Sequence, residues 1–140
     1  MLFRSHSLHF HGFPNASAVF DGLPESGLSV NMNATLTYYY NVKEPGTYMY
    51  HCHVEATEHM QMGMLGNLYV RATQQSNLSN RTFTSGWVHV NGMKYAYNDG
   101  DGKTYYDVEY PLQLGSFDPD FHDASMGDRK STRLNSSHRL

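Results

Sequence analysis

Two histidine-rich segments, far apart in the chain, constrain the fold more than any other feature of the sequence. Both contain side chains that bind metals, and together they comprise His6, His9, His11, His51, Cys52, His53, His59 and Met64. In each segment, histidines recur at every second position, which is the side-chain period of a β-strand rather than of a helix. The pattern therefore predicts strands that carry candidate ligands on their faces.

Strand geometry places the histidines of each H-x-H pair together. Side chains two residues apart point to the same face of a strand, so His9 shares a face with His11, and His51 shares a face with His53. This side offers imidazole nitrogen only, a donor type that suits copper among other metals.

The opposite side has a different donor set. Cys52 lies between two histidines and points away from them, and His6 is an odd number of residues from both His9 and His11. We therefore expect His6 on the side of Cys52, with His59 and Met64 completing the group. Two imidazoles, a thiolate and a weak thioether are the ligands of a blue-copper centre. A zinc ion takes four ligands around one ion, which does not explain ligands on two faces.

The remaining sequence predicts an all-β domain. Alternating or β-branched and aromatic runs, separated by Gly/Pro-rich turns, favour a sandwich. The expected strands cover residues 5–13, 36–42, 47–53 and 65–71, with a loop or a single helical turn at 54–62.

Composition excludes several classes of protein. The chain has 140 residues, a net charge of −3 and one cysteine. A single cysteine cannot form an intrachain disulfide, and the charge is not that of a nucleic-acid binder. No apolar run is long enough to predict a membrane span.

The chain is expected to be organised in four parts. Residues 1–71 form a β-domain that carries the metal motifs and is N-terminally truncated, because the motifs begin at once. Residues 72–104 are polar and predict a linker or long connection. Residues 105–127 are expected to start a second β-domain, because residues 107–114 alternate again like an opening strand. Residues 128–140 resemble the translation of a sequencing adapter, so we interpret them as an artefact.

At the metal motifs the sequence resembles the multicopper oxidases, which are built from cupredoxin domains. That family carries H-x-x-H-x-H-G and later H-C-H, which here are residues 6–12 and 51–53. The resemblance covers about residues 5–71 and implies a Greek-key β-sandwich. It implies type 1 copper at His6, Cys52, His59 and Met64, a type 2 ligand at His9, and type 3 ligands at His11, His51 and His53.

The resemblance also implies a reaction. A reducing substrate gives single electrons to type 1 copper, and they pass to a trinuclear copper cluster that reduces dioxygen to water. Half of that cluster comes from another cupredoxin domain or subunit, so the chain alone is expected to be inactive. Asp21 matches a family acid and is a candidate proton relay, although a turn residue before Gly22 explains it equally well.

Other interpretations stay open. The chain could be a copper electron-transfer module, or resemble the copper nitrite reductases, because the spacing from Cys52 to His59 is longer than in laccase-like domains. The reductases lack the second histidine of H-C-H, so His53 favours an oxidase. A third interpretation is a nonfunctional partial gene product. Four N-glycosylation sequons within residues 1–127 suit a secreted protein, although the N-terminus shows no signal peptide. The reducing substrate is not predicted.

Overall fold

The computed structural model describes residues 5–13, 16–75 and 82–127. The predicted all-β class is confirmed: short antiparallel strands dominate, in the manner of a cupredoxin-like fold. The strands are β1 (Ser5–His6), β2 (His9–His11), β3 (Val30–Asn31), β4 (Gly46–His51), β5 (Leu65–Val70), β6 (Lys94–Tyr95) and β7 (Tyr105–Tyr106). The helices are α1 (Ala56–Gln61) and the 3₁₀ turns η1 (Ala18–Phe20) and η2 (Thr73–Gln75).

The sheet of β2, β4 and β5 positions the metal motifs. β4 lies in the middle and pairs with both neighbours, and its register sets His9 opposite His51. Phe10 faces Tyr50 in the same pairing, and its ring packs 4.8 Å from that of Tyr40 and 5.5 Å from that of Phe13. Aromatic packing on one side of β2 therefore leaves the histidine side available for ligands.

Two strand predictions need correction. The strand expected at 5–13 is broken at Ser7 and Leu8, so β1 pairs with β3 while β2 joins β4. Residues 36–42 form no strand. Their tyrosines instead make side-chain contacts, because the Tyr38 hydroxyl donates to the Leu28 carbonyl and the Tyr40 hydroxyl donates to that of Phe20. The aromatic residues of this run thus pack through their side chains and do not pair as a strand.

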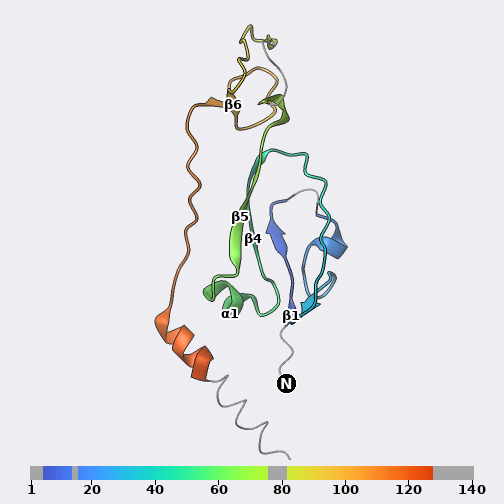
Figure 1. The fold of residues 1–140 in the computed structure, drawn as a ribbon, viewed down its shortest axis with the longest axis vertical. Helices are drawn as coiled ribbons and strands as arrows, with labels where there is room; N and C mark the ends of the chain where they lie inside the picture. The colour runs from blue at the N-terminus through green and yellow to red at the C-terminus, as the bar shows by residue number, and fades with distance from the viewer. Residues whose placement is uncertain (1–4, 14–15, 76–81, 128–140) are drawn as a thin grey trace, which may run out of the picture.

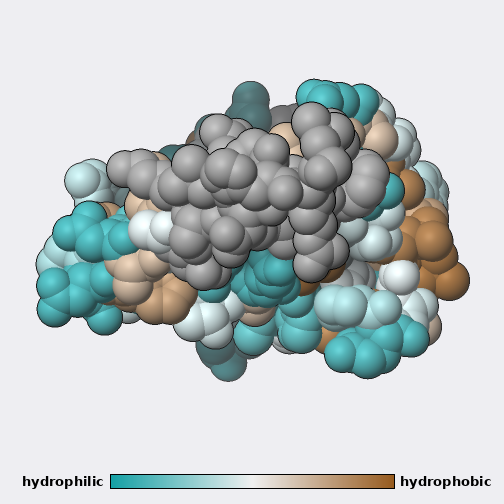
Figure 2. All heavy atoms as spheres, turned by 90° about the horizontal axis from the view of Figure 1, so that it is seen from below, coloured by the Kyte–Doolittle hydropathy of each residue, from teal (hydrophilic) through white to brown (hydrophobic). Residues whose placement is uncertain are grey.

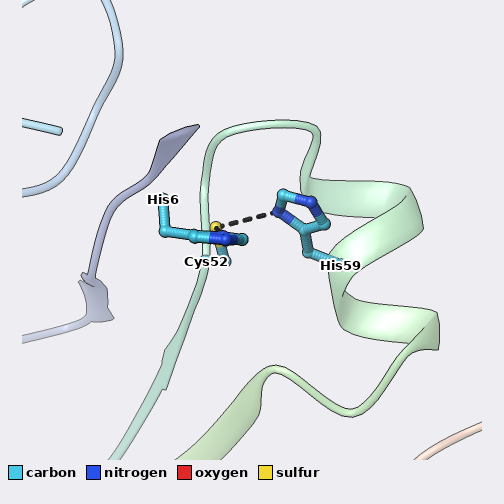
Figure 3. A group of neighbouring side chains, drawn as sticks. All are labelled: His6, Cys52 and His59. Atoms are coloured by element: carbon cyan, nitrogen blue, oxygen red, sulfur yellow. Dashed lines mark hydrogen bonds between the residues drawn. The ribbon is translucent and has the colours of Figure 1, made fainter. Parts of the chain in front are cut away.

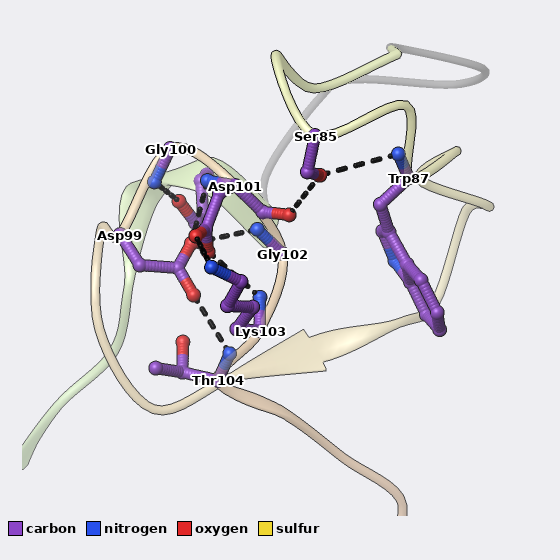
Figure 4. Close-up of polar contacts among 9 residues, drawn as sticks. Ser85, Trp87, Asp99, Gly100, Asp101, Gly102, Lys103 and Thr104 are labelled. Carbon is purple, nitrogen blue, oxygen red and sulfur yellow. Dashed lines mark hydrogen bonds and ion pairs between the residues drawn. The ribbon is translucent and has the colours of Figure 1, made fainter.

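The part that follows β5 folds around a small core of its own. Ala72, Phe83 and Tyr95 are buried together there, and β6 pairs with β7. Beside this core, the Asp99 carboxylate accepts hydrogen bonds from the backbone of Gly102 and Thr104 (Figure 4). The domain boundaries predicted from the sequence stay a prediction, although residues 82–106 are not a structureless linker.

The Asp99 carboxylate is also bonded to a residue outside its loop. The Gln74 amide also donates to Asp99, at 2.9 Å. Desolvation alone would raise the pKa of Asp99, but the hydrogen bonds from Gln74, Thr104 and Gly102 outweigh it and hold the pKa well below its usual range. Lys103 pairs with Asp101 at 3.0 Å. Hydrogen bonds therefore stabilise the Asp99 carboxylate, and an ion pair stabilises that of Asp101.

The last described segment runs back along the sheet. After β7, residues 107–118 are extended and exposed, and 119–127 are helical and lie near α1 (Figure 1). The alternating strand predicted at 107–114 is therefore wrong. Its alternate side chains Val108, Tyr110, Leu112 and Leu114 are all exposed. The interpretation of residues 128–140 as an adapter lies outside the described residues. Among the described helices, none has the length and apolar character of a membrane span.

Candidate metal centre

Cys52 lies at the first residue after β4, where the chain leaves the sheet. Its side chain is 2% exposed, and its backbone N–H donates to the Met64 carbonyl at 3.1 Å. His6, on β1, approaches the sulfur from one side, and His59, on α1, approaches it from the other (Figure 3). The Sγ atom lies 3.8 Å from Nδ1 of His6 and 3.1 Å from Nδ1 of His59. One ligand atom from each of these three residues thus lies within 4.8 Å of the others.

His59 reaches the sulfur because a short helix interrupts the path from β4 to β5. The chain enters α1 through Glu55, whose φ of 49° lies in the left-handed region. Glu55 then lies 3.7 Å from Nε2 of the His59 ring, leaving Nδ1 directed at Cys52. The Glu55 carboxylate is thus within ion-pair distance of the ring nitrogen that does not contact Cys52. His59 itself is 2% exposed.

Met64 follows α1 and closes the loop. Its backbone N–H donates to the His59 carbonyl, and its carbonyl accepts from Cys52. Met64 therefore connects the two residues through its main chain, while its side chain is 39% exposed. Its role as a thioether ligand stays a prediction.

The four histidines of the other group also lie together. The ring of His9 lies 4.9 Å from that of His11, 5.6 Å from that of His51 and 5.1 Å from that of His53. The Nε2 atoms of His11 and His51 are 2.7 Å apart. The side that the strand period predicted to be imidazole-only is therefore a cluster of four rings drawn from two strands and the residue after Cys52.

The electrostatics of this cluster favour a neutral His11 ring. Burial lowers the pKa of His11, and the neighbouring rings of His51, His9 and His53 lower it further. Nδ1 of His51 lies 2.7 Å from the Cys52 carbonyl, which can only accept, so this nitrogen carries the proton. In the neutral His51 ring, Nε2 then carries the lone pair that accepts a hydrogen bond from Nε2 of His11. Neutral imidazole is the form that binds metal.

Asp21 lies beside the cluster. Nδ1 of His9 is 2.7 Å from the Asp21 backbone carbonyl and 3.3 Å from a carboxylate oxygen. The backbone carbonyl accepts a hydrogen bond from Nδ1, and the carboxylate lies within ion-pair distance of the same nitrogen, which leaves Nε2 of His9 for a metal. The predicted proton relay stays a prediction, but the position of Asp21 shows an orienting contact as well.

Sequence reasoning missed two contributors to the site. The Ser7 hydroxyl accepts from the His53 backbone N–H at 3.3 Å, across 46 residues, and the Glu55 carboxylate lies 3.7 Å from the His59 ring. Ser7 has no motif of its own. Glu55, four residues before a candidate ligand on a helix, could have been found from its spacing. His89, by contrast, is buried in the second core and belongs to neither group.

The fold and the site together define a cupredoxin-like protein with a group of one cysteine and two histidines that could bind a metal. Residues 2–75 match the family described as multicopper oxidase, which is more than half of the chain. The chain therefore belongs to the multicopper oxidase family. No curated protein and no solved structure matches it. Membership implies copper as the metal and oxidoreductase activity of the copper-oxidase type.

Proposed function

We propose that this protein takes single electrons from a small reducing substrate at type 1 copper and passes them to a trinuclear copper cluster that reduces dioxygen to water. His6, Cys52, His59 and Met64 would hold the type 1 copper. His9 would be a type 2 ligand, and His11, His51 and His53 would be type 3 ligands. The observation that carries this proposal is the convergence of His6 and His59 on the Cys52 sulfur.

The chain's own residues favour the function in three ways. Cys52 is buried, so its thiolate is kept from water and from oxidants. Its covalent neighbours His51 and His53 belong to the four-ring group, which makes one tripeptide a short path between the two groups. Asp21 orients His9 and is a candidate for moving protons at the cluster.

The proposal includes a partner. The four imidazoles of this chain form half of the cluster that the family uses, so a second cupredoxin domain or subunit would supply the rest. Without that half, the chain would hold type 1 copper but not reduce dioxygen. We propose residues 105–127 as the start of such a domain, preceded by a connection at 72–104.

Copper loading of the full chain tests the proposal. We expect an intense visible thiolate-to-copper band, because sulfur donates directly to the metal. Cys52→Ser removes the band, whereas His53→Ala, which alters only the other group, keeps it. A band that survives Cys52→Ser, or its absence from the wild type, would overturn the type 1 assignment.

Copper stoichiometry separates the alternatives. A pure electron-transfer module or a nitrite reductase-like protein needs no metal at the H-x-H pair of β2. The oxidase interpretation predicts copper beyond the first ion per chain, and predicts that His11→Ala removes this extra copper while leaving the visible band. Loading that stops at one ion per chain in every associated form would favour the electron-transfer module.

We further propose that the protein acts outside the cell. The sequons at Asn15, Asn33, Asn77 and Asn80 support this. Of these, Asn33 is described: it is exposed in a turn, with φ of 62°. Expression in a secretory eukaryotic host followed by enzymatic removal of N-glycans tests the support, because a glycan-free secreted product would withdraw it.

A further inference from the structure

The helix that presents His59 is too short to be stable by itself. α1 has six residues, whereas isolated helices need about 12 or more to form in water. Its first turn is entered from Glu55 in the left-handed region, which is an unfavourable conformation for a residue other than glycine. Contacts from elsewhere must therefore keep α1, and with it His59, against Cys52.

Two such contacts come from the end of the described chain. The Asp118 backbone N–H donates to the Gln61 side chain at 3.1 Å, and the Ser125 hydroxyl donates to the Glu58 carboxylate at 2.8 Å. Glu58 and Gln61 lie on either side of His59 in the sequence of α1. Residues that are 57 and 67 positions away in the sequence thus contact α1 at its last residue and near its middle.

The helical segment 119–127 is built to make these contacts. Its N-terminus is capped by the Asp118 carboxylate, which accepts from the backbone of Asp120 and Phe121. Phe121, His122 and Ser125 are partly buried while their neighbours are exposed, which is the spacing of one helix face. In the coloured part of the view from below, hydrophilic side chains are most frequent at the left and lower edges, and the most hydrophobic ones lie at the right (Figure 2).

The segment is also held at its other end. Arg71, the first residue after β5, makes a two-pronged ion pair with Glu109, and the Tyr106 hydroxyl donates to the same carboxylate. Residues 110–117 therefore run between two attachment points, one beyond each end of β5 (Figure 1). A span that is fixed at both ends restricts the motion of helix 119–127 relative to α1.

We propose that residues 109–125 act as a brace that positions His59 at the Cys52 sulfur, with Gln61, Glu58 and Ser125 as positioning residues. The proposal rests on the proposed function only for the identity of His59 as a copper ligand. Loosening the brace frees α1 to move away from β4. In the metal-free protein this exposes the thiol, and in the copper-loaded protein it changes the ligand field at the metal.

The test compares Ser125→Ala with Ser125→Thr, which keeps the hydroxyl, and with Ser116→Ala, which changes an exposed serine of the same segment. The first readout is the rate at which a thiol reagent modifies Cys52 in the metal-free full chain. We expect Ser125→Ala to react at least about tenfold faster, as the loss of a hydrogen bond to a charged group predicts. Ser125→Thr and Ser116→Ala should react at the wild-type rate.

The second readout is the visible band and reduction potential of the copper-loaded protein. Both shift in Ser125→Ala and return in Ser125→Thr if the brace positions His59. An unchanged thiol rate in Ser125→Ala and in Gln61→Ala would overturn the brace, even where the wild type shows a normal band. A wild type without any band would contradict the proposed function, while the thiol rate would still decide the brace.

Discussion

Gly22 allows β2 and the Asp21 turn to approach each other closely, and its replacement by alanine is a sharp test of this packing. Gly22 has φ of 73°, and a Cβ there would lie 2.2 Å from the Leu8 backbone oxygen and 2.9 Å from the His9 backbone nitrogen. Both neighbours are main-chain atoms, so no side chain can turn aside. Normal contact requires the loop to move outward by about 1 Å.

That movement has a consequence for the site. The Asp21 carbonyl lies 2.7 Å from Nδ1 of His9, so a shift of about 1 Å breaks this hydrogen bond. The left-handed backbone costs alanine about 1–2 kcal/mol, the lost hydrogen bond about 1 kcal/mol and the repacking about 1 kcal/mol or more. We therefore expect Gly22→Ala to lower the free energy of unfolding by about 3–4 kcal/mol.

Gly12→Ala is the matched control. Gly12 has φ of 68°, but a Cβ there would meet nothing within 4 Å. Each glycine-to-alanine change lowers the conformational entropy of the unfolded chain by the same amount, so this contribution cancels in the comparison. Calorimetry should show the melting temperature falling by about 10 °C for Gly22→Ala and by about 4 °C for Gly12→Ala. Equal decreases would refute the close approach, as would an unchanged His9 Nδ1 signal in nitrogen NMR.

Three further predictions concern other parts of the chain. The hydrogen bond and charge of Arg71 lower the pKa of Glu109 to about 2. The ion pair therefore stabilises the fold above the ordinary carboxyl pKa, and this stability is lost as pH falls towards 2. In Arg71→Ala, an NMR titration should show the pKa of Glu109 moving back up. Asp99→Ala should speed amide hydrogen exchange throughout its loop and lower the free energy of unfolding by roughly 2 kcal/mol. Unchanged protection from exchange would count against this hydrogen-bond network. In chemical denaturation, Phe10→Ala should lower the free energy of unfolding by about 3 kcal/mol and Val108→Ala by less than about 0.5 kcal/mol. A similar decrease for both would contradict the assignment of Phe10 to the core.

Local patterns in the sequence predicted much of the protein. The alternation of His9 with His11 and of His51 with His53 indicated strands and sorted the ligands by face, because the side-chain period of a strand is a property of neighbouring residues. The same residues carried the family resemblance, which the match to multicopper oxidases confirmed. The all-β class was predicted for the same reason.

Contacts between distant segments could be known only from the tertiary structure. Residues 36–42 and 107–114 have the composition or alternation of strands, yet neither forms one, because a ladder also needs a partner edge. The approach of His59 to Cys52 depends on where α1 is held, and Ser125 holds it from 67 residues away. The sequence period predicts on which face of a strand a side chain lies. Which faces contact one another depends on the packing of segments that are far apart in the sequence, and this packing must offset the entropy lost in closing long loops.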